Sequence, residues 1–102
     1  MTKLKKKVVV IGAGHNALTC ASYLAKSGFE VEVHESRSEV GGMACTREFT
    51  EGYKVPGVAH LLHMLNPGIQ KWLDLNKNGL EFSASRLKTI SLNPNGNALV
   101  ID

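Results

Sequence analysis

Apolar and polar positions over the first 35 residues predict a strand, a helix and a second strand. Four consecutive β-branched residues at 8–11 form a run typical of a short buried strand. Apolar residues then recur at helical spacing over 15–27, and Gly28 ends this helix. Strict alternation over 30–34 predicts a second strand. Because a helix joins the two strands, we expect them to lie parallel, as the start of a right-handed βαβ unit.

The pattern changes after residue 35. Residues 36–60 contain several glycines and no apolar run long enough for a crossover helix, so we expect a loop-rich excursion. Asn66 and Pro67 then begin a helix that ends near residues 78–79. Residues 80–83, 87–92 and 98–101 are predicted strands, and the turn at 93–97 joins the last two as a hairpin. This last third is a small α+β segment.

Composition and charge limit the classes of protein. The chain has 102 residues, 43% of them hydrophobic, which is an ordinary globular composition. Lys3, Lys5, Lys6 and Lys7 supply much of the net charge of +3, and no aromatic residue interleaves with them, so a solvated lead-in is favoured over a nucleic-acid arm. Glycines interrupt the apolar run that follows, which argues against both a signal peptide and a membrane span.

The two cysteines and four histidines give no metal or redox motif. Cys20 and Cys45 form no C-x-x-C pair, which favours a reducing cytoplasm, and Cys20 is expected to be a small core residue of the first helix. His60 and His63 could share a helical face, but the neighbourhood offers no further ligands. We therefore expect no metal site.

The turn between the first strand and the helix has the pattern G-x-G-x-x-A. Gly12 and Gly14 let the backbone turn sharply and approach a pyrophosphate closely, and Ala17 lets the helix pack near the sheet. The helix N-terminus adds a partial positive charge, where Asn16 is expected to cap and His15 to contact a phosphate oxygen. Such a turn alone is weak evidence, because ordinary strand–helix corners also use glycine.

Two later features strengthen the interpretation as a dinucleotide site. Glu35 lies at the end of the second strand, where a carboxylate can accept hydrogen bonds from the ribose hydroxyls and repel a 2′-phosphate; taken alone, it would be a polar strand end. Gly41 and Gly42 suit a loop that folds back over the same dinucleotide, although a plain surface turn is the alternative. Arg37 either adds positive charge at the adenosine end or is a solvated surface residue.

Residues 8–42 resemble the N-terminal FAD-binding fingerprint of phytoene desaturase-like and amine oxidase-like flavoproteins. The sequence over 12–18, the Glu35-x-Arg37 pair and the run 41–44 are most similar to phytoene dehydrogenase-related FAD/NAD(P)-dependent oxidoreductases, a group that includes pyridine nucleotide-disulfide oxidoreductase domain 2-like proteins. Met43 stands where amine oxidases often have arginine, which places amine oxidation second. Cys45 has no partner for a redox disulfide. The similarity continues more weakly through the helix at Asn66.

This resemblance implies an α/β fold: a Rossmann-like FAD-binding βαβ start in residues 1–60, and the start of a substrate-side α+β segment in 61–102. It implies FAD as cofactor, an oxidoreductase activity on an unidentified small-molecule substrate, and a chain that is the amino-terminal piece of an enzyme, with no catalytic residue assigned. A complementary C-terminal chain or a second copy is an expected partner. The alternatives are a non-catalytic nucleotide-binding or interaction module and half of a split flavoprotein. The candidate cofactor-binding residues are Gly12, Gly14, His15, Asn16, Ala17, Glu35, Ser36, Arg37, Gly41, Gly42 and Met43.

Overall fold

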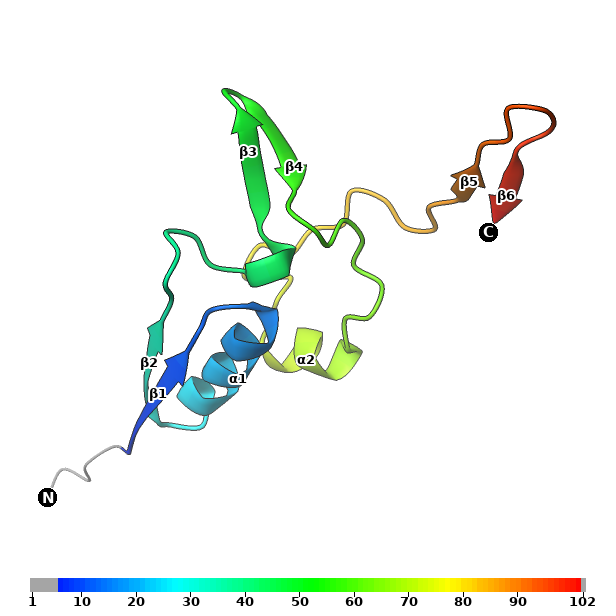
Figure 1. Ribbon diagram of the computed structural model, residues 1–102. Coiled ribbons are helices and arrows are strands. Elements are labelled where there is room, and N and C mark those ends of the chain that lie inside the picture. Colours follow the sequence, from blue (N-terminus) through cyan, green and yellow to red (C-terminus); the bar gives the residue numbers. More distant parts are fainter. Residues whose placement is uncertain (1–5, 102) are drawn as a thin grey trace, which may run out of the picture.

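A parallel pair of strands and one helix form the most regular part of the molecule (Figure 1). The computed structural model describes residues 6–101. Strand β1 (Lys7–Ile11) is followed by helix α1 (His15–Lys26) and strand β2 (Glu30–His34), and β2 lies parallel to β1 with Val8 beside Val31. This arrangement confirms the predicted strand–helix–strand start and the α/β class. Lys3 and Lys5 of the predicted lead-in lie outside the described residues.

Helix α1 covers one face of the β1–β2 pair and leaves the other open. Ala21 faces the strands and is 7% exposed, and its small side chain lets the helix approach the sheet. On the uncovered face Val9 is 52% exposed and Ile11 80%, so β1 is only half buried, contrary to the fully buried strand that its sequence predicts. The prediction for Cys20 is also wrong: its side chain is exposed, because the adjacent Ala21 takes the position against the sheet.

Gly28 ends α1 as predicted. Its φ of 91° lies in the left-handed region, where a side chain is strained. Its N–H donates to the carbonyl of Ala25 at 3.0 Å, and the next N–H, of Phe29, donates to the carbonyl of Leu24 at 3.1 Å. These two bonds form a Schellman motif, which satisfies carbonyls at the end of the helix and turns the chain into β2.

Residues 36–60 contain an element that the sequence analysis did not predict. A short 3₁₀ helix, η1 (Gly42–Ala44), precedes an antiparallel hairpin of β3 (Thr46–Thr50) and β4 (Tyr53–Pro56). No α-helix crosses over in this segment, as expected. The hairpin gives no clear apolar alternation because all nine of its residues are exposed. A hydrogen bond from the N–H of Gly52 to the Glu48 carboxylate, at 2.8 Å, stabilises its turn instead.

The C-terminal third is less regular than predicted. Helix α2 (Pro67–Trp72) begins as expected, with the Asn66 side chain accepting from the N–H of Gly68, but turns replace its last residues, and Asp74 there has a φ of 51°. The strand predicted over 80–83 is wrong, because no neighbouring strand pairs with it among the described residues. Strands β5 (Thr89–Ser91) and β6 (Leu99–Ile101) form the predicted hairpin, each shorter than expected.

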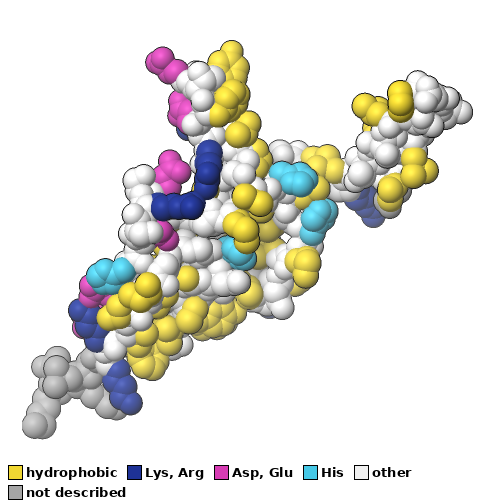
Figure 2. All heavy atoms as spheres, in the orientation of Figure 1, with side chains coloured by type: hydrophobic (Ala, Val, Ile, Leu, Met, Phe, Trp, Pro, Cys, Tyr) yellow, Lys and Arg dark blue, Asp and Glu magenta, His cyan; other side chains and the backbone are white. Residues whose placement is uncertain are grey.

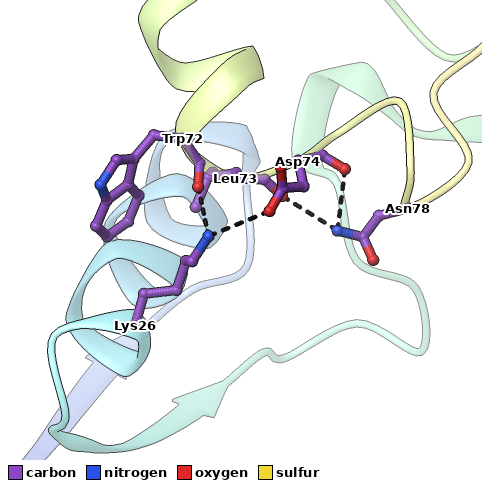
Figure 3. Close-up of polar contacts among 5 residues, drawn as sticks. All are labelled: Lys26, Trp72, Leu73, Asp74 and Asn78. Carbon is purple, nitrogen blue, oxygen red and sulfur yellow. Dashed lines mark hydrogen bonds and ion pairs between the residues drawn. The ribbon is translucent and has the colours of Figure 1, made fainter.

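Aromatic stacking and the polar contacts of one lysine hold α2 against α1, and Figure 3 shows the polar contacts. The rings of Tyr23 and Trp72 stack with centroids 4.0 Å apart. Lys26 donates to the carbonyl oxygen of Trp72 at 2.5 Å, and its Nζ lies 3.5 Å from the Asp74 carboxylate. The Asn78 side-chain amide donates to the Asp74 carbonyl at 3.1 Å. A cation near the carboxyl end of a helix is favourable, so Lys26 stabilises both helix ends that meet here.

The two hairpins extend away from this unit, and Figure 2 shows apolar side chains over both of them. The molecule measures 74 × 32 × 21 Å, and within residues 6–101 only Ala13 and Ala21 are buried apolar residues. In the same part of the chain, no helix has the length and apolarity needed to span a membrane, and no three acidic, histidine or cysteine side chains gather as metal ligands. The division at residues 60 and 61 stays a prediction.

Gly28 offers a test of how the helix end stabilises the fold. We expect Gly28→Ala to lower the free energy of unfolding by about 1 kcal/mol, because alanine is strained at positive φ. Urea unfolding followed by circular dichroism measures this change. Gly28→Asn is the matched control, since asparagine tolerates the left-handed region better than alanine and a Cβ at Gly28 would meet no atom within 4 Å, so this variant should lose less stability. Equal stability of the two variants would contradict the strained conformation.

Candidate functional site

The turn after β1 presents free backbone donors at the start of α1. Gly12 has a φ of 92°, and its N–H donates to the carbonyl of His34 at 2.6 Å, which holds the turn against the end of β2. The first intrahelical bond runs from the N–H of Leu18 to the carbonyl of Gly14 at 2.9 Å. The three amides before it, of residues 15–17, therefore have no intrahelical acceptor and lie at the positive end of the helix dipole.

His15, Asn16 and Ala17 contribute to this end of the helix through their backbone. The expectation that Asn16 caps the helix is wrong: Gly14 is the N-cap residue, no side chain caps the helix there, and Asn16 lies within the first turn. No acidic residue occupies that turn. An anion would therefore meet the positive end of the helix dipole and no repelling carboxylate from the helix itself.

The surroundings of Gly14, at the start of α1, are open. Its φ of −73° is open to every residue, and a Cβ built on it would meet no atom within 4 Å. Neither the backbone conformation nor the packing of the chain therefore requires glycine at this position. The space beside Gly14 is therefore open, and Gly14 precedes the start of α1, where the helix dipole favours an anion.

Glu35 holds the end of β2 against the glycine turn. One of its carboxylate oxygens accepts from the N–H of Ala13 at 2.8 Å, and the other accepts from the N–H of Arg37 at 3.0 Å and from the Ser36 hydroxyl at 3.3 Å. The hydrogen bond from Arg37, followed by that from Ala13, lowers the pKa of Glu35 below its ordinary value of 4.5. The carboxylate is therefore ionised at neutral pH, beside the turn.

The glycine pair returns to the same turn. The N–H of Gly41 donates to the carbonyl of Ala13 at 2.7 Å, and Gly41 pairs with Gly14 in a parallel bridge. Gly42 has a φ of 59°, and a Cβ on it would lie 3.0 Å from the Cα of Gly14. Both the conformation and the close approach thus require glycine at residue 42. The chain after β2 folds back onto the turn, while its contact with a dinucleotide stays a prediction.

A cavity of about 710 Å³ opens between the chain after β2 and the start of β3. In Figure 2, basic and acidic side chains gather over this part of the molecule. Of the sequence-predicted residues, Glu35, Arg37, Gly42 and Met43 line the cavity. The glycine turn adjoins it through the Gly42–Gly14 contact, and Ser36 reaches the site through its hydrogen bond to Glu35.

Five further residues line the cavity and were missed by sequence reasoning: Ser38, Glu39, Cys45, Arg47 and Glu48. The first two follow Arg37 directly, so their position could have been inferred from it. The others depend on η1 and β3, whose exposed residues gave no strand signal. The sequence gives one signal for these three residues: charged residues follow the glycine pair that was predicted to fold back over the dinucleotide.

The lowered pKa of Glu35 predicts a measurable titration. Because the folded-state pKa is depressed, the carboxylate supports the turn above pH 4.5 and this support is lost as the pH falls through the lowered folded-state pKa. We expect the amide proton shifts of Ala13 and Arg37 to titrate together with a midpoint below 4.5 in two-dimensional NMR spectra. The transition should vanish in Glu35→Gln, and a midpoint at or above the ordinary value would refute the contacts.

Comparison with known proteins gives related sequences. Pyridine nucleotide-disulfide oxidoreductase domain-containing protein 2 of Rattus norvegicus is 45% identical over 73 residues, which is 72% of this chain and 13% of that protein. A limonene dehydrogenase subunit of Castellaniella defragrans is 53% identical over 51 residues, 49% of this chain and 9% of that protein. Flavin-dependent L-tryptophan oxidase RebO of Lentzea aerocolonigenes is 43% identical over 58 residues, 57% of this chain and 12% of that protein.

The chain thus spans about an eighth, or less, of the length of these curated relatives. The family model described as an NAD(P)-binding Rossmann-like domain matches residues 10–75, which include the end of β1, the glycine turn, Glu35, the glycine pair and α2. This match covers more than half of the chain and agrees with the parallel β1–β2 pair joined by α1. The chain belongs to the family of NAD(P)-binding Rossmann-like domains.

Proposed function

We propose that the chain is the N-terminal FAD-binding portion of an FAD-dependent oxidoreductase of the phytoene dehydrogenase-like group, and that it binds the ADP moiety of FAD. The observation that carries the proposal is the glycine turn at the start of α1: a Cβ on Gly14 would meet no atom within 4 Å, and the N–H of the adjacent Ala13 donates to the Glu35 carboxylate. The names of two relatives, a flavin-dependent oxidase and a dehydrogenase, support a flavin oxidoreductase.

The pyrophosphate would lie at the N-terminus of α1. Gly12 and Gly14 allow its close approach, and the amides of His15, Asn16 and Ala17 would donate to its oxygens. Each charge-assisted hydrogen bond of this kind contributes about 1.5 to 3 kcal/mol. Since the first turn carries no acidic side chain, the helix end opposes none of this attraction.

Glu35 would bind the ribose of the adenosine. Its carboxylate is ionised and lies at the end of β2, and an ionised carboxylate only accepts hydrogen bonds, as two ribose hydroxyls require. The same charge would repel a 2′-phosphate. This arrangement favours FAD or NAD over NADP.

The segment after β2 favours FAD over NAD. A nicotinamide-type domain ordinarily continues with a crossover helix, whereas this chain returns through Gly41 and Gly42 to the glycine turn and then forms the β3–β4 hairpin. The glycine pair would cover the pyrophosphate or the adjoining sugar. Bound FAD supplies the hydride-transfer chemistry, and the residues of this chain bind and orient its ADP half. We assign no catalytic residue to residues 1–102.

Residues 1–60 begin the FAD-binding domain, and 61–102 begin a substrate-side segment. The absence of a C-x-x-C pair in the sequence favours a reducing, cytoplasmic compartment.

The exposed side chain of Ile11 favours a second candidate function. Ile11 is 80% exposed on the uncovered face of β1, so the chain could be a non-catalytic module, or half of a split flavoprotein, whose open sheet face docks on a partner chain. A stable, monodisperse monomer in size exclusion that captures no partner in a pull-down would decide against that candidate.

Gly14→Ala tests the proposed phosphate site. We expect the affinities for FAD and ADP to fall about tenfold or more, because the new methyl group occupies the open space beside residue 14 at the start of α1. Isothermal titration measures both affinities, and circular dichroism without ligand checks that the variant stays folded, since alanine is a weaker N-cap than glycine. Ser22→Ala, in the same helix but away from its N-terminus, should bind like the unaltered chain. If Gly14→Ala binds FAD and ADP as tightly as the unaltered chain, the phosphate does not lie at this turn.

A further inference from the structure

The side chain of Arg47, at the second position of β3, passes close to the backbone of the residue that follows β4. The N–H of Gly57 donates to the carbonyl of Cys45 at 2.9 Å and so holds the chain after β4 against the start of β3. A Cβ on Gly57 would lie 3.0 Å from both the Nε of Arg47 and the carbonyl oxygen of Cys45. Gly57 therefore leaves room for the Arg47 side chain, which lines the cavity beside Glu35.

The guanidinium groups of Arg37 and Arg47 are available to a ligand. Neither forms an ion pair within residues 6–101, although three carboxylates line the same cavity. Two of those carboxylates already accept from backbone amides: Glu35 from Ala13, and Glu48 from Gly52. The arginine side chains are thus near acidic groups without being held by them.

The charge of the cavity decides which part of a dinucleotide suits it. Glu35, Glu39 and Glu48 carry three negative charges against the two positive charges of the arginines. With no excess positive charge, the cavity gives a phosphate dianion little attraction, while the positive end of α1 lies at the glycine turn. A neutral, flat group with a π-face suits it better, because a planar guanidinium stacks on aromatic rings.

The geometry points to Arg47 as a binding residue that stacks on the adenine base of the bound dinucleotide. This inference rests on the proposed function, which places the pyrophosphate at Gly14 and the ribose at Glu35. The base then continues into the cavity between the chain after β2, with Arg37, and the start of β3, with Arg47. The β3–β4 hairpin thereby forms one wall of the adenosine site.

The test uses the full chain and three ligands: adenosine, AMP and ADP. We expect Arg47→Gln and Arg47→Lys to weaken the binding of all three by the same factor, about fivefold to tenfold, since lysine keeps the charge but loses the planar group. Affinities come from amide-shift titrations by NMR, which also report that each variant stays folded. Lys71→Gln is the matched control: it removes an exposed positive charge from α2, outside the cavity lining, and should change no affinity.

The possible results separate the inference from the proposed function. Unchanged affinities in both Arg47 variants, with ADP still bound by the unaltered chain, would overturn the role of Arg47 alone. Weaker binding of AMP and ADP but not of adenosine would also overturn the role of Arg47 in stacking, because Arg47 would then contact the phosphate and not the base. A folded, unaltered chain that binds none of the three ligands would overturn the proposed function, and this inference with it.

Discussion

The backbone groups of Ala13 connect the three segments on which the site depends. Its N–H donates to the Glu35 carboxylate at 2.8 Å, and its carbonyl accepts from the N–H of Gly41 at 2.7 Å. Ala13 is 1% exposed, so its own N–H and carbonyl are buried, and a buried backbone group left without a partner would be costly. The end of β2 and the returning glycine pair are thereby fixed against the turn that starts α1.

This arrangement places different chemistry on the two sides of Glu35. Toward α1 lie backbone donors, a helix dipole and an open space at Gly14, which suit a phosphate. Toward β3 lies a cavity with both acidic and basic side chains, which suits a neutral base and sugar. A dinucleotide has these groups in the same order along its length. The β3–β4 hairpin, which looks peripheral in Figure 1, thus borders the adenosine end of the proposed site.

The sequence predicts the parts of the fold that depend on strong local patterns. The β-branched run of β1, the helical repeat of α1, and the turn residues Gly12 and Gly28 each have a backbone reason that is visible in the sequence. The β3–β4 hairpin could not be predicted, because its exposed strands rely on backbone pairing and on the Glu48–Gly52 bond. Arg47 was missed for the same reason, since only the hairpin brings it near Glu35.

The most direct measurement is an NMR titration of the isotope-labelled chain with ADP, in which every backbone amide is a probe. The account predicts that the largest amide shifts occur at His15, Asn16 and Ala17, because their N–H groups would meet the phosphates. Smaller shifts should follow at Glu35 and Gly42. If these amides do not move while ADP binds elsewhere, or if ADP causes no shifts in the folded chain, the glycine turn is not a dinucleotide site.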